Sequence, residues 1–327
     1  MSSKLAPFAP AVNTLAAVVV LVAAVPLLGW GADTGTAHSH TVTDSTSWLL
    51  WRAVGAASLL LFLVVGSRGV AQLRQSRRES DPAGRRRITV FTWLALLFVV
   101  VTATAVTLGA RAVAAHREPV PIGYGSVRTS GLVAIGALAL VPWLAQVWLV
   151  HARIRDLGRE ISQVSIEPTT AQTGPSPLYA PLQQLLALWE VITRCVLAFA
   201  LTVVAAIVTT GAMRSVTLEA FPPPKDGPDP FPSSYVLLYG AAFAFLLLLV
   251  TVPMIAAWRA RATLAVEAIV PIPDTLAFDP AWDDQRKRWE GLLQLDVSLL
   301  RSPLTALSVF APLATSALAA FLPELAK

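Results

Sequence analysis

Two ionisable residues lie at the start of a long apolar stretch, where a charge needs an explanation. Glu190 and Arg194 are four residues apart, so on a helix they share one face in the favourable acid-before-base order. Ionisable side chains at membrane depth are candidates for function because a charge in hydrocarbon is expensive. One interpretation is a self-satisfied pair at the membrane boundary, with Arg194 extending toward lipid headgroups.

A second interpretation brings in Asp296, which lies on the apolar face of a predicted helix at 279–301. If the Asp296 carboxylate reaches Arg194, the three residues form a buried polar latch between that helix and the apolar segments. This hypothesis depends only on two charges, Arg194 and Asp296, that lie on otherwise apolar faces.

Three histidines are candidate metal ligands. His38 and His40 occur as His-Ser-His in one polar connection, and His116 lies in another. Three neutral imidazoles suit Zn²⁺ if the two connections meet. The alternative, which we favour, is a solvated loop rich in Ser, Thr and His, because the spacing is not helical and no supporting hydrogen-bond partner is evident. No His-Glu-x-x-His motif is present, so zinc-dependent hydrolysis is not indicated.

Other sequence motifs point away from catalysis. The residues at 122–125, Ile-Gly-Tyr-Gly, match a potassium-filter signature over three positions, but the polar, proline-broken run at 117–121 favours an ordinary glycine turn. The chain has no phosphate-binding glycine loop and no Gly-x-Ser-x-Gly motif. Cys195 is the sole cysteine, so no disulfide can form within the chain. We expect no enzymatic activity and no cofactor.

The elements that must position these residues are membrane-spanning helices. The chain has 327 residues, of which 55% are hydrophobic and 14% charged, and its mean hydropathy is +0.63. This composition excludes a water-soluble fold, and about 20 apolar residues are enough to cross a bilayer. We predict an all-α, polytopic helical membrane bundle in a single domain, 1–327. Its seven predicted spans are about 11–32, 48–66, 88–110, 130–150, 190–212, 234–258 and 304–321.

Two of these spans have alternatives. The segment 304–321 is short and carries Pro312 at its middle, so a kinked, re-entrant or surface-lying segment competes and the count is then six. The segment 1–32 also resembles a secretory signal with cleavage near residue 31 or 32. Against cleavage, the apolar run is longer than a usual signal core, and Trp30 is a poor neighbour for a cleavage site.

The basic residues predict the orientation. With a cytoplasmic N-terminus, 17 Lys and Arg residues fall on the inner side and six on the outer side. By the positive-inside rule the N-terminus is therefore cytoplasmic and the C-terminus extracytoplasmic. The excess of Arg over Lys favours a bacterial source, hence the plasma membrane. Most tryptophans fall at span boundaries, whereas Trp143 lies inside a span and is expected to pack against another helix.

Seven arginines lie in one inner connection, 67–87, which we predict to be a loop. Such a loop attracts anionic lipid headgroups at about 1 kcal/mol per basic residue. A nucleic-acid partner is not indicated, because the basic residues flank apolar blocks instead of forming a patch interleaved with aromatics. The arginines predicted to face the lipid are Arg77, Arg78, Arg85, Arg86 and Arg87.

Two inner connections carry helical patterns. The run after Pro177 is apolar with interspersed glutamines, so the helix of the fifth span is expected to begin well before the membrane. Asp279-Pro280 is typical of a helix start and predicts an amphipathic helix at about 279–301 that lies on the membrane surface or docks on the bundle. The proline-rich outer segment 213–233 is expected to be stiff and extended.

The sequence favours a non-catalytic accessory, scaffold or signalling-type membrane subunit that meets a protein partner, or a second copy of itself, through its cytoplasmic helices. The spans carry few polar groups near the midplane, where transporters usually place several. Transport of an ion or small solute is the alternative, with hinges at Pro142 and Pro253 and Gln146 as a polar contact.

Overall fold

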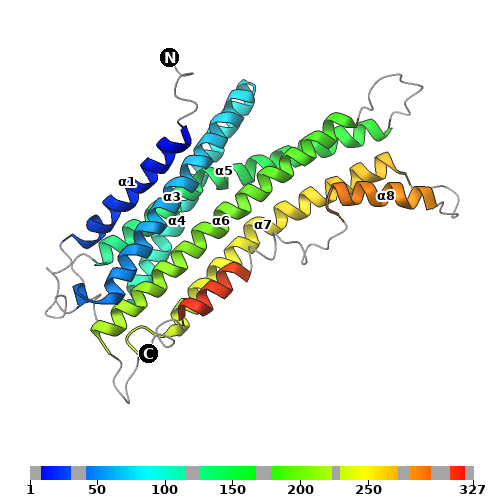
Figure 1. The fold of residues 1–327 in the computed structure, drawn as a ribbon. Helices are drawn as coiled ribbons and strands as arrows, with labels where there is room; N and C mark the ends of the chain where they lie inside the picture. Colours follow the sequence, from blue (N-terminus) through cyan, green and yellow to red (C-terminus); the bar gives the residue numbers. More distant parts are fainter. Residues whose placement is uncertain are drawn as a thin grey trace.

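The computed structural model describes residues 9–30, 42–114, 125–166, 178–222, 229–271, 280–295 and 310–320. This part of the chain forms helices and contains no strand, so the predicted all-α class is confirmed (Figure 1). The helices are α1 (Ala9–Gly29), α3 (Thr46–Glu79), α4 (Pro82–Ala114), α5 (Gly125–Ile166), α6 (Tyr179–Ala220), α7 (Ser233–Ile269), α8 (Pro280–Leu292) and a C-terminal helix, Phe310–Ala320.

Five of these helices, α3 to α7, are long and apolar enough to cross a bilayer. The protein is therefore a multi-pass helical membrane protein. Two shorter apolar stretches, Ala16–Gly29 and Phe310–Ala320, lie at the positions of the first and last predicted spans. The predicted count of seven spans is not confirmed.

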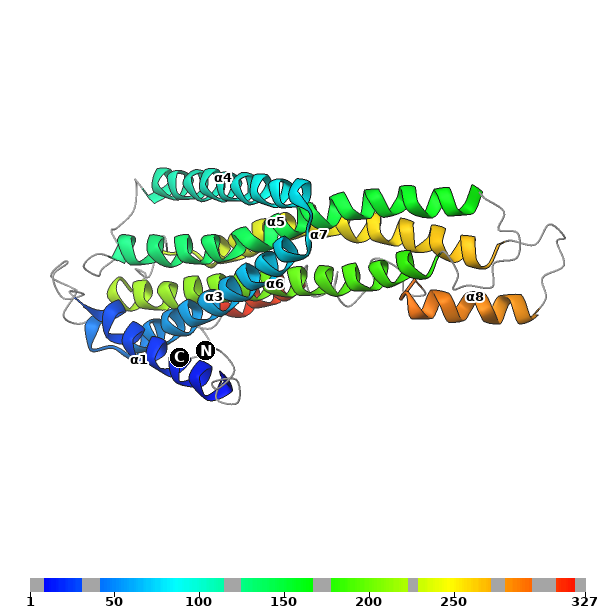
Figure 2. The same ribbon diagram turned by 90° about the horizontal axis from the view of Figure 1, so that it is seen from above.

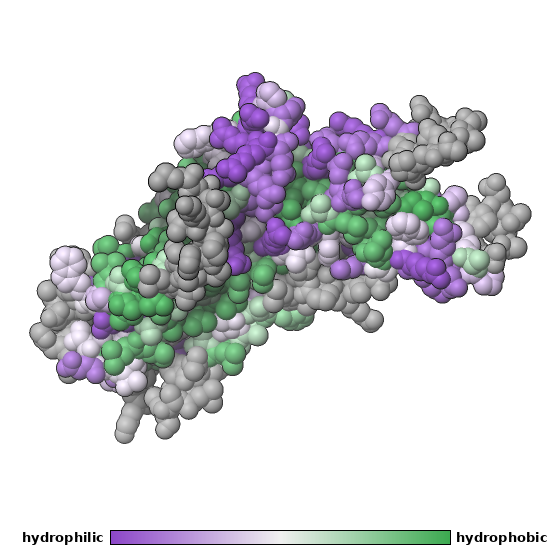
Figure 3. Space-filling view, turned by 45° about the horizontal axis from the view of Figure 1, so that its top comes forward, coloured by the Kyte–Doolittle hydropathy of each residue, from purple (hydrophilic) through white to green (hydrophobic). Residues whose placement is uncertain are grey.

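Consecutive long helices run antiparallel, so the bundle has two ends (Figure 1). One end holds the α3–α4 connection, the last residues of α5 and α7, the first residues of α6, and α8; we call it the basic end. Hydrophilic residues gather there, whereas hydrophobic residues cover much of the remaining visible surface (Figure 3). At the opposite end, α1 ends against α3, where the Arg52 guanidinium donates to the Val25 carbonyl (3.0 Å).

The three longest helices extend well beyond the thickness of a bilayer. Helices α5 and α6 have 42 residues each and α7 has 37. At ~1.5 Å per residue they measure roughly 55–63 Å, about twice the ~30 Å hydrocarbon core. Figure 2 shows them running well past the α3–α4 turn, with α8 beside their far end. We call this part the projection: 151–166 of α5, 179–189 of α6, 259–271 of α7, and 280–295 with α8.

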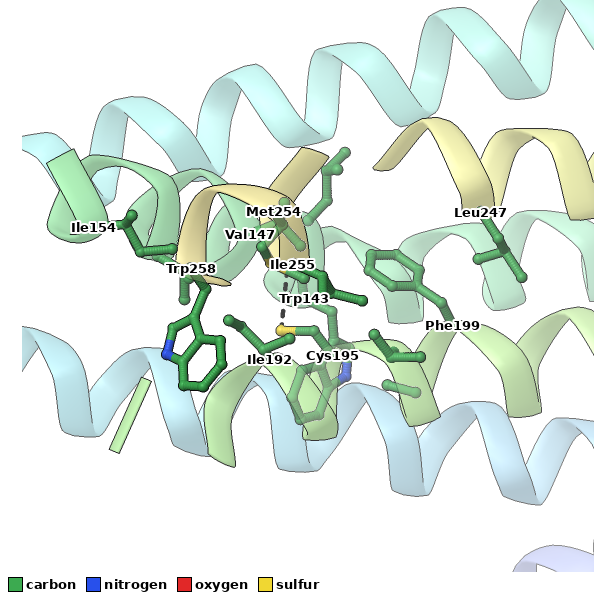
Figure 4. Close-up of a cluster of buried hydrophobic side chains, with 14 of the residues drawn as sticks. Trp143, Val147, Ile154, Ile192, Cys195, Phe199, Leu247, Met254, Ile255 and Trp258 are labelled. Carbon is green, nitrogen blue, oxygen red and sulfur yellow. Dashed lines mark hydrogen bonds between the residues drawn. The ribbon is translucent and has the colours of Figure 1, made fainter. Parts of the chain in front are cut away.

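One hydrophobic core runs from the spans into the projection. It includes Phe199 and Met254 in the spans and Ile154 in the projection, all buried (Figure 4). Leu293 of the projection belongs to the same core. The early start of the fifth-span helix is confirmed, because α6 begins at Tyr179.

Two tryptophans join helices within this core through indole hydrogen bonds. The Trp143 Nε1–H donates to the Val65 carbonyl of α3 (2.9 Å), as expected of a tryptophan that packs against another helix. The Trp258 Nε1–H donates to the Leu185 carbonyl of α6 (2.9 Å). Buried indoles usually need such an acceptor.

The predicted arginine-rich loop at 67–87 is wrong, because this segment is a helical hairpin. Helix α3 continues to Glu79 and α4 begins at Pro82, so only Ser80 and Asp81 connect them. The Asp81 carboxylate caps α4 by accepting from the Gly84 N–H (2.8 Å). The prediction was wrong because it placed the helix end where the arginines begin and hydropathy falls. Arg, Gln and Glu are good helix formers, so the helix continues through them.

The amphipathic helix starts where predicted but ends earlier. Helix α8 covers Pro280–Leu292 instead of reaching 301. Gln294 adopts a left-handed backbone (φ 53°), and the Leu295 N–H donates to the Glu290 carbonyl (2.8 Å), which closes the helix end. The Arg259 guanidinium of α7 donates to the Leu295 carbonyl (2.8 Å), so this end of α8 is docked on the bundle.

Candidate functional site

The basic end divides into two arms, the α3–α4 hairpin and the projection, which diverge in Figure 1. Polar contacts join the arms where they separate. The Gln146 Nε2 of α5 donates to Ser76 Oγ of α3 (3.3 Å), and Arg87 of α4 pairs with Asp156 of α5 (3.4 Å). A third contact joins Arg194 of α6 to Gln72 of α3. We call these residues the arm junction: Gln72, Ser76, Arg87, Gln146, Asp156 and Arg194.

Glu190 and Arg194 meet within this junction. The Arg194 guanidinium pairs with the Glu190 carboxylate and also donates to Gln72 Oε1 of α3 (3.2 Å). The side chains of Arg194 and Glu190 are 48% and 66% exposed, so the pair lies at the surface of the helices. Sequence reasoning identified the pair but missed its link to α3. Asp296 lies outside the described residues, and the latch between it and Arg194 stays a prediction.

The junction contacts are individually weak. Arg87 and Asp156 have side chains 54% and 36% exposed, and pairs of this kind contribute about 0.5 kcal/mol or less. The core inside the projection is, by contrast, tightly packed: Leu157 of α5, Leu185 of α6 and Ala262 of α7 have no exposed surface. The projection is therefore a firm unit, and its polar link to the α3–α4 hairpin is the softer contact.

Four arginine side chains surround an open depression of about 430 Å³ on the α3–α4 hairpin. Arg74, Arg77 and Arg78 come from α3 and Arg85 from α4. All four are exposed, as is Arg86. A depression lined by guanidinium groups can bind phosphate or carboxylate groups through charge-assisted hydrogen bonds. Three of the five arginines predicted to face lipid thus line one concave surface, whereas Arg87 pairs with Asp156 instead.

Helix α8 presents a charged face to its surroundings. No residue within Pro280–Leu292 is buried, and Asp284, Lys287 and Arg288 are exposed. Ion pairs four residues apart organise this face, including Lys287 with Asp283 (2.5 Å). The hydrogen bond that the Lys287 ammonium donates to the Asp283 carboxylate, together with the charge of that carboxylate, raises the pKa of Lys287. A solvated, ordered helix of this kind is a surface that another protein can contact.

The predicted metal ligands are not tested. His38, His40 and His116 lie outside the described residues. Within the described ranges, no group of three or more His, Cys, Asp and Glu side chains has an arrangement that holds a metal ion.

The predicted hinge prolines lie inside helices in an apolar setting. Pro142 is within α5 and Pro253 within α7, and these two helices pack together. Gly69 of α3 lies so close to Pro142 that an added Cβ would be 2.7 Å from the proline Cγ. Gln146 is buried, but its side chain is used by the arm junction.

Arg214 at the opposite end was missed as a structural residue. It is the charged side chain among the buried polar residues of the described ranges, and it pairs with Asp229 (3.1 Å). It also donates to the carbonyls of Phe231 (2.8 Å) and Ala320 (2.9 Å). The only sequence signal was that an arginine and an aspartate both lie in the proline-rich segment 213–233.

Comparisons of the chain with protein-family models, with curated proteins and with solved structures found no match.

Proposed function

We propose that this protein is a non-catalytic accessory or scaffold subunit of a bacterial plasma membrane. Its projection contacts a partner protein, or a second copy of the chain, in the cytoplasm. The N-terminus and the basic end then face the cytoplasm, and the C-terminus faces outward. The positive-inside rule supports this orientation, because the arginines of the α3–α4 hairpin and the charges of α8 share one end.

The observation that carries this proposal is the projection itself. Helices α5, α6 and α7 continue for several turns beyond a bilayer's thickness with a packed core, and α7 then holds α8 by hydrogen bonds. A bundle that only needs to anchor itself in lipid has no use for this added length. The charged face of α8 lies at the exposed side of this unit and is the proposed contact surface.

The α3–α4 hairpin has a different proposed role. Its arginine-lined depression is expected to hold anionic lipid headgroups, with Arg77, Arg78 and Arg85 close to the membrane surface. The weak polar contacts of the arm junction then connect an arm that contacts lipid, the α3–α4 hairpin, with an arm that contacts the partner, the projection.

Purification from native membranes tests the proposal. We expect a stoichiometric partner, or a homo-oligomer, to remain with the wild-type protein. The double variant Asp284→Arg, Arg288→Glu reverses two exposed charges on α8 without altering net charge and should lose it. Arg78→Glu on the other arm is the control and should retain it. Loss in both variants, or in neither, would contradict a contact surface on α8.

Transport of an ion or small solute is the second candidate. It is favoured by one observation, that the helices carrying Pro142 and Pro253 pack together. In proteoliposomes this function requires a solute flux that falls when Pro142 or Pro253 is replaced by Ala. A protein that forms no permeation path shows no flux above that of empty liposomes.

A further inference from the structure

A cavity of about 180 Å³ lies between the spans of α3, α4, α5, α6 and α7. Its walls include Phe98 of α4, Leu140 of α5, Ala206 of α6, and Tyr239 and Phe243 of α7. The two aromatic rings of α7 pack edge to face with centroids 4.6 Å apart, which gives this wall a defined shape. The cavity shares no lining residue with the arm junction or with α8, so it belongs to neither proposed contact surface.

The walls offer little to water or to a polar solute. The side chains that line the cavity are aliphatic and aromatic apart from a few hydroxyls, and the Thr202 hydroxyl already donates to the Ala198 carbonyl of its own helix (2.9 Å). An apolar cavity of about 150 Å³ in a soluble protein stays dry and binds benzene. This cavity is larger and has the same chemistry, so an apolar ligand is the favourable occupant.

The entrance of the cavity faces the hydrocarbon of the bilayer. Helices α4 and α7 both line the cavity, but α4 packs chiefly on α5 and makes no extensive contact with α7. Only 11% of the apolar window of α4 is buried within the protein, so most of that helix faces lipid. Phe98 of α4 and Leu246 of α7 line the cavity and are also exposed, which places the opening between these two helices.

We propose that this cavity binds one hydrocarbon chain of a membrane lipid, which enters laterally between α4 and α7. Lipid is the molecule present at this entrance, and a flexible chain fits a narrow apolar space. A transmembrane helix of a second copy is about 10 Å wide with its side chains and does not fit in a cavity of about 180 Å³. Because it involves neither α8 nor the arm junction, this site is independent of the proposed function.

Photo-crosslinking of the full chain in nanodiscs tests the site. The probe is a phosphatidylcholine with a diazirine in the middle of one acyl chain, and adducts are mapped by mass spectrometry. We expect adducts on cavity residues such as Thr202 and Tyr239. Ala206→Phe fills the cavity and should lower these adducts about fivefold or more, because a site without room loses its affinity. Ala241→Phe, on an exposed position of α7 that faces away from the cavity, should leave them unchanged.

A second variant keeps the test decisive if Ala206→Phe does not fold. Val250→Phe narrows the cavity from the α7 wall and should lower the same adducts. Adducts confined to exposed residues of α4, or cavity adducts that persist at the wild-type level in a folded cavity-filling variant, would overturn the proposal. Crosslinks from the cavity to a second copy of the chain would overturn it as well.

Discussion

Replacement of Arg214 by Met is expected to detach the C-terminal helix from the bundle. The guanidinium donates to three acceptors: the Phe231 carbonyl (2.8 Å), the Ala320 carbonyl (2.9 Å) and the Asp229 carboxylate (3.1 Å). Ala320 is the last described residue of the C-terminal helix. One side chain of α6 therefore holds both the α6–α7 connection and a helix distant in sequence.

The expected cost follows from burial. The Arg214 side chain is 3% exposed, and breaking a buried ion pair by removing one partner costs about 3–5 kcal/mol. Asp229 is 32% exposed and regains some solvation, so the lower end, about 3 kcal/mol of unfolding free energy, is the appropriate figure. Arg214→Lys keeps the charge but not the planar fork and should lose roughly half of that.

Two readouts check this prediction in lipid bicelles. The first is the unfolding free energy, with Arg155→Met at an exposed position of α5 as the control, expected within about 0.5 kcal/mol of wild type. The second is alkylation of Ala320→Cys in a Cys195→Ala background, since Cys195 is the sole cysteine. Ala320 is buried, so labelling should be slow until Arg214 is replaced. An Arg214→Met protein as stable as the control, with slow labelling, would refute the reasoning.

Two further predictions compare matched residues in chemical denaturation of the purified protein. Trp258→Phe removes a buried indole that donates a hydrogen bond and should cost about 2 kcal/mol, whereas Trp51→Phe removes a buried Nε1 without a partner in the described chain and should cost less. Equal losses would contradict this difference. Gly69→Ala places a Cβ 2.7 Å from Pro142 and should destabilise by about 1–3 kcal/mol. The added Cβ of Gly131→Ala meets nothing within 4 Å, so this variant should be more stable by up to about 1 kcal/mol. A Gly69→Ala protein more stable than the Gly131→Ala protein would contradict the close contact between α3 and α5.

The membrane class and five of the spans could be predicted from sequence, because long apolar runs are a strong local signal. The same signal failed at the helix ends. It marks where hydrocarbon ends, whereas a helix continues as long as its residues favour it, as α3 does through Arg77 and Arg78. The start of α8 was predictable from Asp279-Pro280, but its end depends on the left-handed Gln294, and glutamine gives no sign of that conformation.

The contacts that position the candidate site were less accessible. Glu190 and Arg194 were paired from their spacing alone, because an i, i+4 pair is a local feature. The contact of Arg194 with Gln72, and that of Arg214 with Ala320, join residues far apart in the chain. Such contacts depend on which helices pack side by side, and hydropathy carries no information on that choice.

Site-specific photo-crosslinking from α8 in native membranes tests the central claim, a partner-binding projection, most directly. A photoreactive amino acid replaces Arg288, which is exposed on α8, and in a matched control it replaces Leu249, which faces lipid on α7. The proposed function predicts one discrete protein adduct from position 288, with the partner that co-purifies, and none from position 249. No discrete adduct from 288, or the same adduct from both positions, would contradict a scaffold that acts through its projection.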